Sequence, residues 1–186
     1  VTVVDNTPPS IFCQNVHNLV LNAAGNGTIT LSDIIYAPST DNCGIASQVI
    51  SRTTFGCGDL GSNNVVLTVT DVNGNASQCA VEIIVIDNTA PVVNCGQPVR
   101  SFSTNAGACT YTATGGSADV TLVTPDNCGP VTFTHNYPGA PSTSTLNGAV
   151  FPIGSTLIQW IATDASGNQT ICWIEIVVSD NIAPVV

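Results

Sequence analysis

Apolar and polar residues alternate along four segments, which fall into two pairs that each flank a short turn. In the first pair, residues 65–70 (VVLTVT) and 79–85 (CAVEIIV) have an apolar side chain at every second position, so that these side chains share one face. A Gly-Asn turn lies between the two segments. Residues 158–163 and 172–178 repeat the pattern. A period of two residues on both sides of such a turn is typical of a β-hairpin. Because no segment shows a sustained helical period, we predict an all-β fold, and the short strands with frequent turns favour a β-sandwich.

A short junction sequence occurs three times and divides the chain. It reads VVDNTPP at 3–9, VIDNTAP at 85–91 and VSDNIAP at 178–184. Between these copies the same landmarks recur in order: an early cysteine, DNCG, a D-x-x-G-N turn and a late cysteine. A repeat with this internal order indicates tandem modules. We predict one module over 5–86 and a second over 87–179, with 1–4 as the tail of a preceding module and 180–186 as the start of a following module or a junction.

The net charge of the chain limits the classes of partner that we expect. Only 8% of the residues are charged, lysine is absent, and twelve carboxylates against two arginines give a net charge of −10. Nucleic acids and anionic membrane surfaces attract basic proteins, so neither is an expected partner. Hard cations are expected instead, and Ca²⁺ is the ion that carboxylate and amide oxygens suit. No apolar run approaches the roughly 20 residues of a membrane span, so we expect no membrane insertion.

Eight cysteines in a small β-rich chain predict disulfides, and therefore an extracellular or cell-surface location. The paired C-x₂₋₄-C spacing of zinc sites and the C-x-x-C of redox proteins do not occur. Four cysteines per module allow three pairings, so the pairing is a choice between alternatives. Cys13 lies eight residues after Asp5, and Cys79 lies eight after Asp71; the second module has the same two offsets. Equal offsets would bring the first and last strands side by side, parallel, with their cysteines level. The pairing we favour is Cys13–Cys79, Cys43–Cys57, Cys95–Cys172 and Cys109–Cys128.

Several of these landmarks together resemble a known family. The D-N-T-x-P junction, DNCG, the stretch FPIGSTLIQWIATDASGN at 151–168 and the closing cysteine strand are similar to the hyalin repeat (HYR) domain. The resemblance implies an immunoglobulin-like fold, found in tandem in secreted and cell-surface proteins, with no catalytic residues. The first module departs from the pattern, because FGCGDLGSNN at 55–64 replaces the F-P-x-G-x-T stretch. It resembles the variant repeat of very large bacterial surface adhesins.

The equal offsets also predict a candidate calcium site in each module. They place each junction aspartate level with the aspartate of the last turn, and in an immunoglobulin-like sandwich the DNCG loop lies at the same end. Ca²⁺ binds six to eight oxygens of this kind, and an ion would relieve the repulsion between close carboxylates. The alternative is that Asp, Asn and Gly only form turns here. The candidate ligands are Asp5, Asp41, Asn42 and Asp71 in the first module and Asp87, Asp126, Asn127 and Asp164 in the second.

Catalysis is not expected. The two histidines, His17 and His135, lie in different modules at unmatched positions, and no nucleophile, metalloprotease or phosphate-loop motif occurs. Of the two tryptophans, the alternation turns Trp160 inward and Trp173 outward. An exposed tryptophan can stack on a sugar or pack against a neighbouring module.

The sequence thus predicts an extracellular structural or adhesive repeat segment that forms a stiff rod or stalk of a cell-surface adhesin. The lack of an initiator methionine and of a signal peptide indicates a mature segment or an excerpt of a longer chain. Two alternatives stay open: a subunit of a head-to-tail filament, and a carbohydrate-binding accessory module. The expected partners are neighbouring copies or repeats of the same protein, with surface glycans as a second class.

Overall fold

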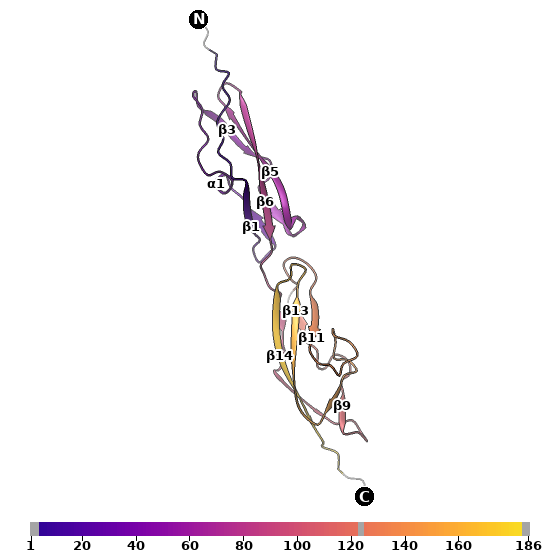
Figure 1. Ribbon diagram of the computed structural model, residues 1–186. Helices are drawn as coiled ribbons and strands as arrows, with labels where there is room; N and C mark the ends of the chain where they lie inside the picture. Colours follow the sequence, from indigo (N-terminus) through magenta and orange to yellow (C-terminus); the bar gives the residue numbers. More distant parts are fainter. Residues whose placement is uncertain (1–3, 123–124, 184–186) are drawn as a thin grey trace. The chain divides into compact units, whose positions relative to one another are not determined.

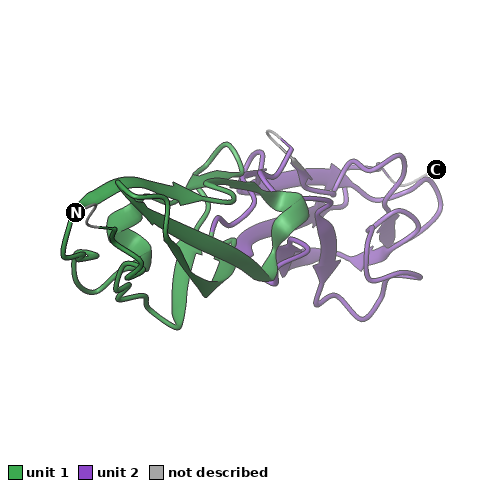
Figure 2. Ribbon diagram, turned by 90° about the horizontal axis from the view of Figure 1, so that it is seen from above, with its two compact units in different colours: residues 1–88 green, residues 89–186 purple. Residues whose placement is uncertain are grey.

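The computed structural model describes residues 4–122 and 125–183, and the chain divides into two compact units, residues 1–88 and 89–186 (Figure 2). Within the described ranges, the helical elements are the one-turn helix α1 (Leu31–Ile34) and the 3-10 turn η1 (Cys57–Asp59). All other regular structure is β-strand, which confirms the all-β prediction. The unit boundary falls inside the second junction sequence. The module limits at 5–86 and 87–179 stay a prediction.

Unit 1 is built on a four-stranded sheet with the order β1-β6-β5-β3 (Figure 1). The long hairpin β5–β6 forms as the alternation predicts, with Leu67 opposite Cys79. The first strand, β1, pairs with the last, β6, in parallel, as the equal offsets predict. A second sheet of two short strands, β2 and β4, completes the sandwich. The strands are β1 (Val16–Val20), β2 (Asn26–Thr28), β3 (Ile45–Ile50), β4 (Thr54–Gly56), β5 (Gly61–Asp71) and β6 (Ala76–Ile86).

Unit 2 repeats this plan with the order β11-β13-β14-β8, and again its edge strand β8 runs parallel to the last strand, β14. Two small sheets, β7 with β10 and β9 with β12, replace the single one of unit 1. The two units are therefore the same immunoglobulin-like sandwich, as predicted. The strands are β7 (Val93–Asn94), β8 (Val99–Ser103), β9 (Thr110–Thr112), β10 (Thr121–Leu122), β11 (Thr132–His135), β12 (Val150–Pro152), β13 (Gly154–Thr163) and β14 (Gln169–Ser179).

The core of each unit lies on the inner face of its hairpin. In unit 2, Trp160 is 1% exposed and packs with Phe151 and Ile174, whereas Trp173 on the outer face is 50% exposed. Burying one large apolar side chain contributes about 1.5–3 kcal/mol, so these alternating rows supply much of the stability of each sandwich. The inward and outward assignments of the two tryptophans are confirmed.

Two of the four favoured disulfides are present. Cys13 is bonded to Cys79, and Cys95 is bonded to Cys172, at sequence separations of 66 and 77 residues. Each bridge joins the segment that enters a unit to its last strand. Closing a loop of this length stabilises a fold by about 4 kcal/mol in the chain-entropy picture.

The other two favoured pairs, Cys43–Cys57 and Cys109–Cys128, are wrong. Cys43 and Cys109 carry free, exposed thiols, and neither Cys57 nor Cys128 is a free thiol. The reason in unit 1 is distance. Cys43 precedes Gly44, whose carbonyl accepts a hydrogen bond from Val72 just beyond the end of β5, whereas Cys57 precedes the start of that strand. Eleven strand residues span about 35 Å, far more than the roughly 4.4–6.8 Å between Cα atoms that a disulfide allows.

Distance also excludes the pair Cys109–Cys128 in unit 2, where the two cysteines lie at opposite ends of β14. Cys128 lies in the loop beside the β13–β14 turn, because Gly129 comes close to Ala165. Cys109 lies at the other end, where it shares a pocket with Asp180 and Ile182. Two cysteines at opposite ends of an eleven-residue strand cannot bond to each other.

Candidate functional site

Three loops bring three aspartates together at the end of unit 1 where the chain enters. Asp5 comes from the junction sequence, Asp41 from the DNCG loop, and Asp71 from the end of β5. One carboxylate oxygen from each lies within 4.8 Å of the other two. We call this group the unit 1 acidic cluster. Its assembly is what the equal offsets predict for these three residues.

The β5–β6 turn holds Asp71 in a fixed orientation. The backbone N–H groups of Asn73 and Asn75 both donate to its Oδ1 at 2.8 Å, and the Asn75 amide donates to its Oδ2 at 2.7 Å. Gly74 has φ +93°, a left-handed conformation that glycine adopts without strain, so the chain can close around the carboxylate. Burial disfavours the Asp71 carboxylate, but the donors from Asn75 and its neighbours outweigh burial, and the pKa of Asp71 lies below its ordinary value. Asp71 is therefore a buried carboxylate that stays charged.

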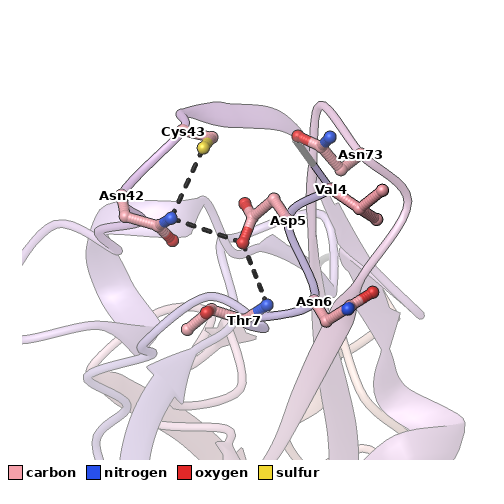
Figure 3. Close-up of a pocket in the computed structure, with 7 residues that line it drawn as sticks. All are labelled: Val4, Asp5, Asn6, Thr7, Asn42, Cys43 and Asn73. Atoms are coloured by element: carbon pink, nitrogen blue, oxygen red, sulfur yellow. Dashed lines mark hydrogen bonds between the residues drawn. The ribbon is translucent and has the colours of Figure 1, made fainter. Parts of the chain in front are cut away.

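Asp5, which is drawn in Figure 3, and Asp41 each use only one oxygen for hydrogen bonds. The Oδ1 of Asp5 accepts from the Thr7 N–H at 3.0 Å and from the Asn42 amide at 3.3 Å. The Oδ1 of Asp41 accepts from the N–H groups of Cys43 and Gly44 at 2.8 and 3.1 Å. The Thr7 N–H is the main cause that holds the pKa of Asp5 below its ordinary value, followed by the Cys43 thiol. Both carboxylates are thus oriented by backbone donors, and the lowered pKa keeps Asp5 in its charged form.

The second oxygens of these two aspartates are the unusual feature. Among the residues that the structure describes, Oδ2 of Asp5 and Oδ2 of Asp41 are buried and have no hydrogen-bond partner. A buried charged oxygen without a donor is costly, and three carboxylates this close together repel one another. A bound cation would satisfy both oxygens and cancel the repulsion. Beside them lies a shallow pocket of about 430 Å³, which has room for an ion and its remaining water ligands.

Asn42 faces Asp5 with its amide nitrogen rather than its oxygen. The two ends of an asparagine amide are nearly the same shape, so a half-turn of the side chain would offer Oδ1 instead. Asn42 therefore lies at the site as predicted, but as a donor to Asp5.

The equivalent residues of the repeat form the second candidate site, with Asp87 from the second junction sequence and the other two from loops of unit 2. One carboxylate oxygen from each of Asp87, Asp126 and Asp164 lies within 4.8 Å of the others. Asp164 accepts from the N–H groups of Ser166 and Asn168 at 2.9 and 2.8 Å, which are the counterparts of the bonds to Asp71. Asp126 accepts from the Cys128 N–H at 3.0 Å, as Asp41 does from Cys43. Asn127 follows Asp126 in the same loop.

Two residues of the sites were missed by the sequence analysis. The amides of Asn75 and Asn168 donate to Asp71 and Asp164 and also reach the main-chain carbonyls of Asp5 and Thr89, at 3.2 and 3.4 Å. The signal was available, because both asparagines end the recurring D-x-x-G-N turn. The sequence pattern assigns them to the turn and not to the set of candidate ligands.

The histidines do not form a shared site. His17 lies on β1 of unit 1, and His135 lies on β11 of unit 2. His135 is buried against Trp160, with ring centroids 4.8 Å apart, and its Nε2 lies 3.2 Å from the carbonyl oxygen of Thr145. Its surroundings are those of a core side chain.

Comparisons with known proteins agree with the extracellular assignment. A family model described as the HYR domain matches residues 86–178, half of the chain. Hyalin of Strongylocentrotus purpuratus is 29% identical over 183 residues, which cover 91% of this chain and 13% of hyalin. The serine-rich adhesin for platelets of Staphylococcus aureus strain USA300 is 28% identical over 165 residues, which cover 84% of this chain and 7% of the adhesin. The chain thus spans a small part of either relative.

The solved structures that match the chain include cadherins. Human protocadherin-24 EC1-2 is 16% identical with a TM-score of 0.42, covering 94% of this chain and 100% of that structure. Mouse cadherin-23 EC22-24 is 12% identical with a TM-score of 0.40, covering 94% and 67%. No helix within the described ranges is long and apolar enough to cross a membrane. The disulfides require an oxidising compartment, and the chain is extracellular. With its repeated junction, a disulfide in each unit between the entering segment and the last strand, and its matching family model, the chain belongs to the HYR domain family.

Proposed function

We propose that this chain is an adhesive repeat segment that forms a stiff rod or stalk of a cell-surface adhesin, with Ca²⁺ bound at the acidic cluster of each unit. The observation that carries the calcium part is the pair of buried oxygens, Oδ2 of Asp5 and Oδ2 of Asp41, which have no donor among the described residues. The junction aspartate is a ligand in each candidate site, so ion binding would order the linker together with the module that follows it. This role needs no catalytic residue.

The disulfides support the mechanical part of the proposal. When the two ends of a module are pulled, force passes along the chain from the junction to the first bridged cysteine, across the bridge, and out through the last strand. In unit 1 the segment between Cys13 and Cys79 lies outside this path. In unit 2 the segment between Cys95 and Cys172 also lies outside this path. Tension can therefore extend only the short segments on either side of each bridge, which is the behaviour that a stalk requires.

Calcium binding can be tested by thermal melting in Ca²⁺ and in chelator. An ion that binds only the assembled cluster stabilises the fold by about 2.7 kcal/mol at a hundredfold excess over its Kd. For a unit of this size that raises the Tm by about 10 °C. Asp41→Asn and Asp71→Asn should each remove most of the shift that arises from unit 1.

Glu82→Gln is the matched control. It removes the same charge from the outer face of β6 and keeps an oxygen that can accept from Ser62, so its calcium shift should equal that of the wild type. Identical melting curves with and without calcium, together with no bound metal by elemental analysis, would remove the ion from the proposal.

Trp173 supports carbohydrate binding as a second candidate function. Its half-exposed ring lies on the outer face of β14, with exposed Ile171 on the same strand and exposed Leu157 on the paired strand β13. An aromatic ring beside apolar neighbours can stack on a sugar face. Glycan-array binding that is lost in Trp173→Ala, but kept in Leu157→Ser, would support this role. Equal binding by both variants and the wild type would count against it.

A further inference from the structure

Two exposed thiols lie beside the first and the third copy of the junction sequence. Cys43 is at the end of unit 1 where the chain enters, next to Asp5, and Cys109 is at the end of unit 2 where the chain leaves, next to Asp180. Asp180 occupies the same place in the third junction copy as Asp5 does in the first. The two free thiols thus mark equivalent junctions at the two ends of the chain.

The cysteines at the equivalent positions of the other unit are oxidised. Cys128 is the counterpart of Cys43 in the DNCG loop of unit 2, and it is disulfide-bonded and 5% exposed. Cys57 lies at the end of unit 1 where the chain leaves, as Cys109 does in unit 2, and it is also disulfide-bonded. The cysteines at the exit of unit 1 and the entry of unit 2 are therefore oxidised, while those at the entry of unit 1 and the exit of unit 2 are free.

We propose that Cys43 of one copy of this chain forms a disulfide with Cys109 of a second copy, which links the entry end of unit 1 in one copy to the exit end of unit 2 in the other. The inference rests on the proposed rod and extends it by naming the partner and the bond. Repeated along a series of copies, the bond gives a covalent fibre without any change within a copy.

The bond requires an oxidant of ordinary extracellular chemistry. The two thiols lose two protons and two electrons as the new S–S bond forms. A low-molecular-weight disulfide such as glutathione disulfide accepts them, its own S–S bond breaks, and it leaves as two thiols through a mixed-disulfide intermediate. Both thiols are exposed, so each is accessible to this exchange.

The acidic surroundings of Cys43 disfavour a bond between two Cys43 thiols. Cys43 lies against the unit 1 acidic cluster, so two such ends would bring six aspartates together and repel. Cys109 lies in a pocket formed with Gly107, Ala108 and Ile182, with Asp180 as its single carboxylate. The small neighbours leave the Cys109 sulfur open to approach. Exposed apolar side chains lie at both ends, Val4 at the first and Ile182 at the second, and can pack together.

The test uses two single variants of the 186-residue chain, Cys43→Ser and Cys109→Ser, in a glutathione redox buffer. The wild type should form a ladder of dimers, trimers and longer species on a non-reducing gel, which collapses to monomer on reduction. Each variant alone should stay monomeric. Mixing the two, one of them ¹⁵N-labelled, should give a mixed dimer and nothing longer, because that dimer retains no partner thiol. Its rate should exceed that of either variant alone by at least about tenfold, because the chain itself joins the exit of one unit to the entry of the next and the proposed bond repeats that order.

Several results would overturn the proposal. These are a wild type that stays monomeric, a ladder that persists after alkylation of the free thiols, and single variants that dimerise with themselves as fast as the mixture. Serine replaces an exposed cysteine in each variant, and an unchanged Tm checks that the fold is kept. The calcium melting experiment does not depend on these thiols, so failure of one proposal can be told apart from failure of the other.

Discussion

The side-chain amide of Asn75 donates a hydrogen bond to the main-chain carbonyl of Asp5 at 3.2 Å, across 70 residues of sequence. The same nitrogen donates to Asp71 at 2.7 Å. One side chain therefore fixes the junction to the last turn of unit 1 and orients two members of the acidic cluster.

The first prediction concerns this asparagine. Asn75→Ala removes both bonds and leaves a buried carboxylate oxygen of Asp71 without its donor, so unfolding free energy should fall by about 1–3 kcal/mol. Calcium affinity should fall as well, because the junction is no longer held. Asn73→Ala is the control, since only the backbone N–H of Asn73 binds Asp71. Urea unfolding measures both variants, and equal stabilities would show that the Asn75 amide is dispensable.

A second prediction concerns the bridge that joins the entering segment of unit 1 to its last strand, β6. Cys13→Ala together with Cys79→Ala should lower the stability of unit 1 by about 4 kcal/mol, because the unfolded chain regains the entropy of a long open loop. Using both substitutions avoids a reactive leftover thiol. Cys43→Ser, which removes a free thiol, should leave stability unchanged. Calorimetry that finds both variants equally stable would contradict this role of the bridge.

Much of the fold was predictable because it depends on local periodicity. Alternation assigned Trp160 to the core and Trp173 to the surface, and equal offsets from Asp5 and Asp71 predicted the parallel pairing of β1 with β6. The pairing of the remaining cysteines was not predictable in this way. It depends on which end of a unit each loop reaches, and spacing along the chain does not record that for Cys57 and Cys109.

The residues of the candidate site could be predicted from the sequence, but the hydrogen bonds of their carboxylate oxygens could not. The repeat places Asp5, Asp41 and Asp71 at one end because each follows or precedes a strand end. Which carboxylate oxygens have donors depends on turn geometry, and only the structure shows that Oδ2 of Asp5 and of Asp41 have none among the described residues.

A third prediction concerns pH. The Arg52 guanidinium, followed by the Gly56 N–H, binds the Asp59 carboxylate and holds the pKa of Asp59 below its ordinary value of 3.8. A carboxyl group with a depressed folded-state pKa stabilises the fold above its unfolded pKa, and this contribution is lost as the pH falls through the lower folded value. Arg52→Gln should therefore destabilise unit 1 at pH 7, and the deficit should shrink as the pH is lowered below about 4.

Arg100→Gln provides the contrast for that experiment. The Arg100 guanidinium donates to the main-chain carbonyls of Cys95, Ser117 and Asp119, which do not titrate. The loss of folding stability in Arg100→Gln should be nearly the same at both ends of the pH range. A deficit of Arg52→Gln that is also constant with pH would mean that the ion pair with Asp59 is not its cause.

Stretching single molecules from their two termini tests the stalk most directly. With both bridges intact, the segments between Cys13 and Cys79 and between Cys95 and Cys172 should contribute no length at any force below bond rupture. After reduction, unfolding of unit 1 should release about 23 nm of further chain and unfolding of unit 2 about 27 nm, at about 3.5 Å per residue. Oxidised molecules that show those same long extensions would contradict the proposed force path and, with it, the stalk.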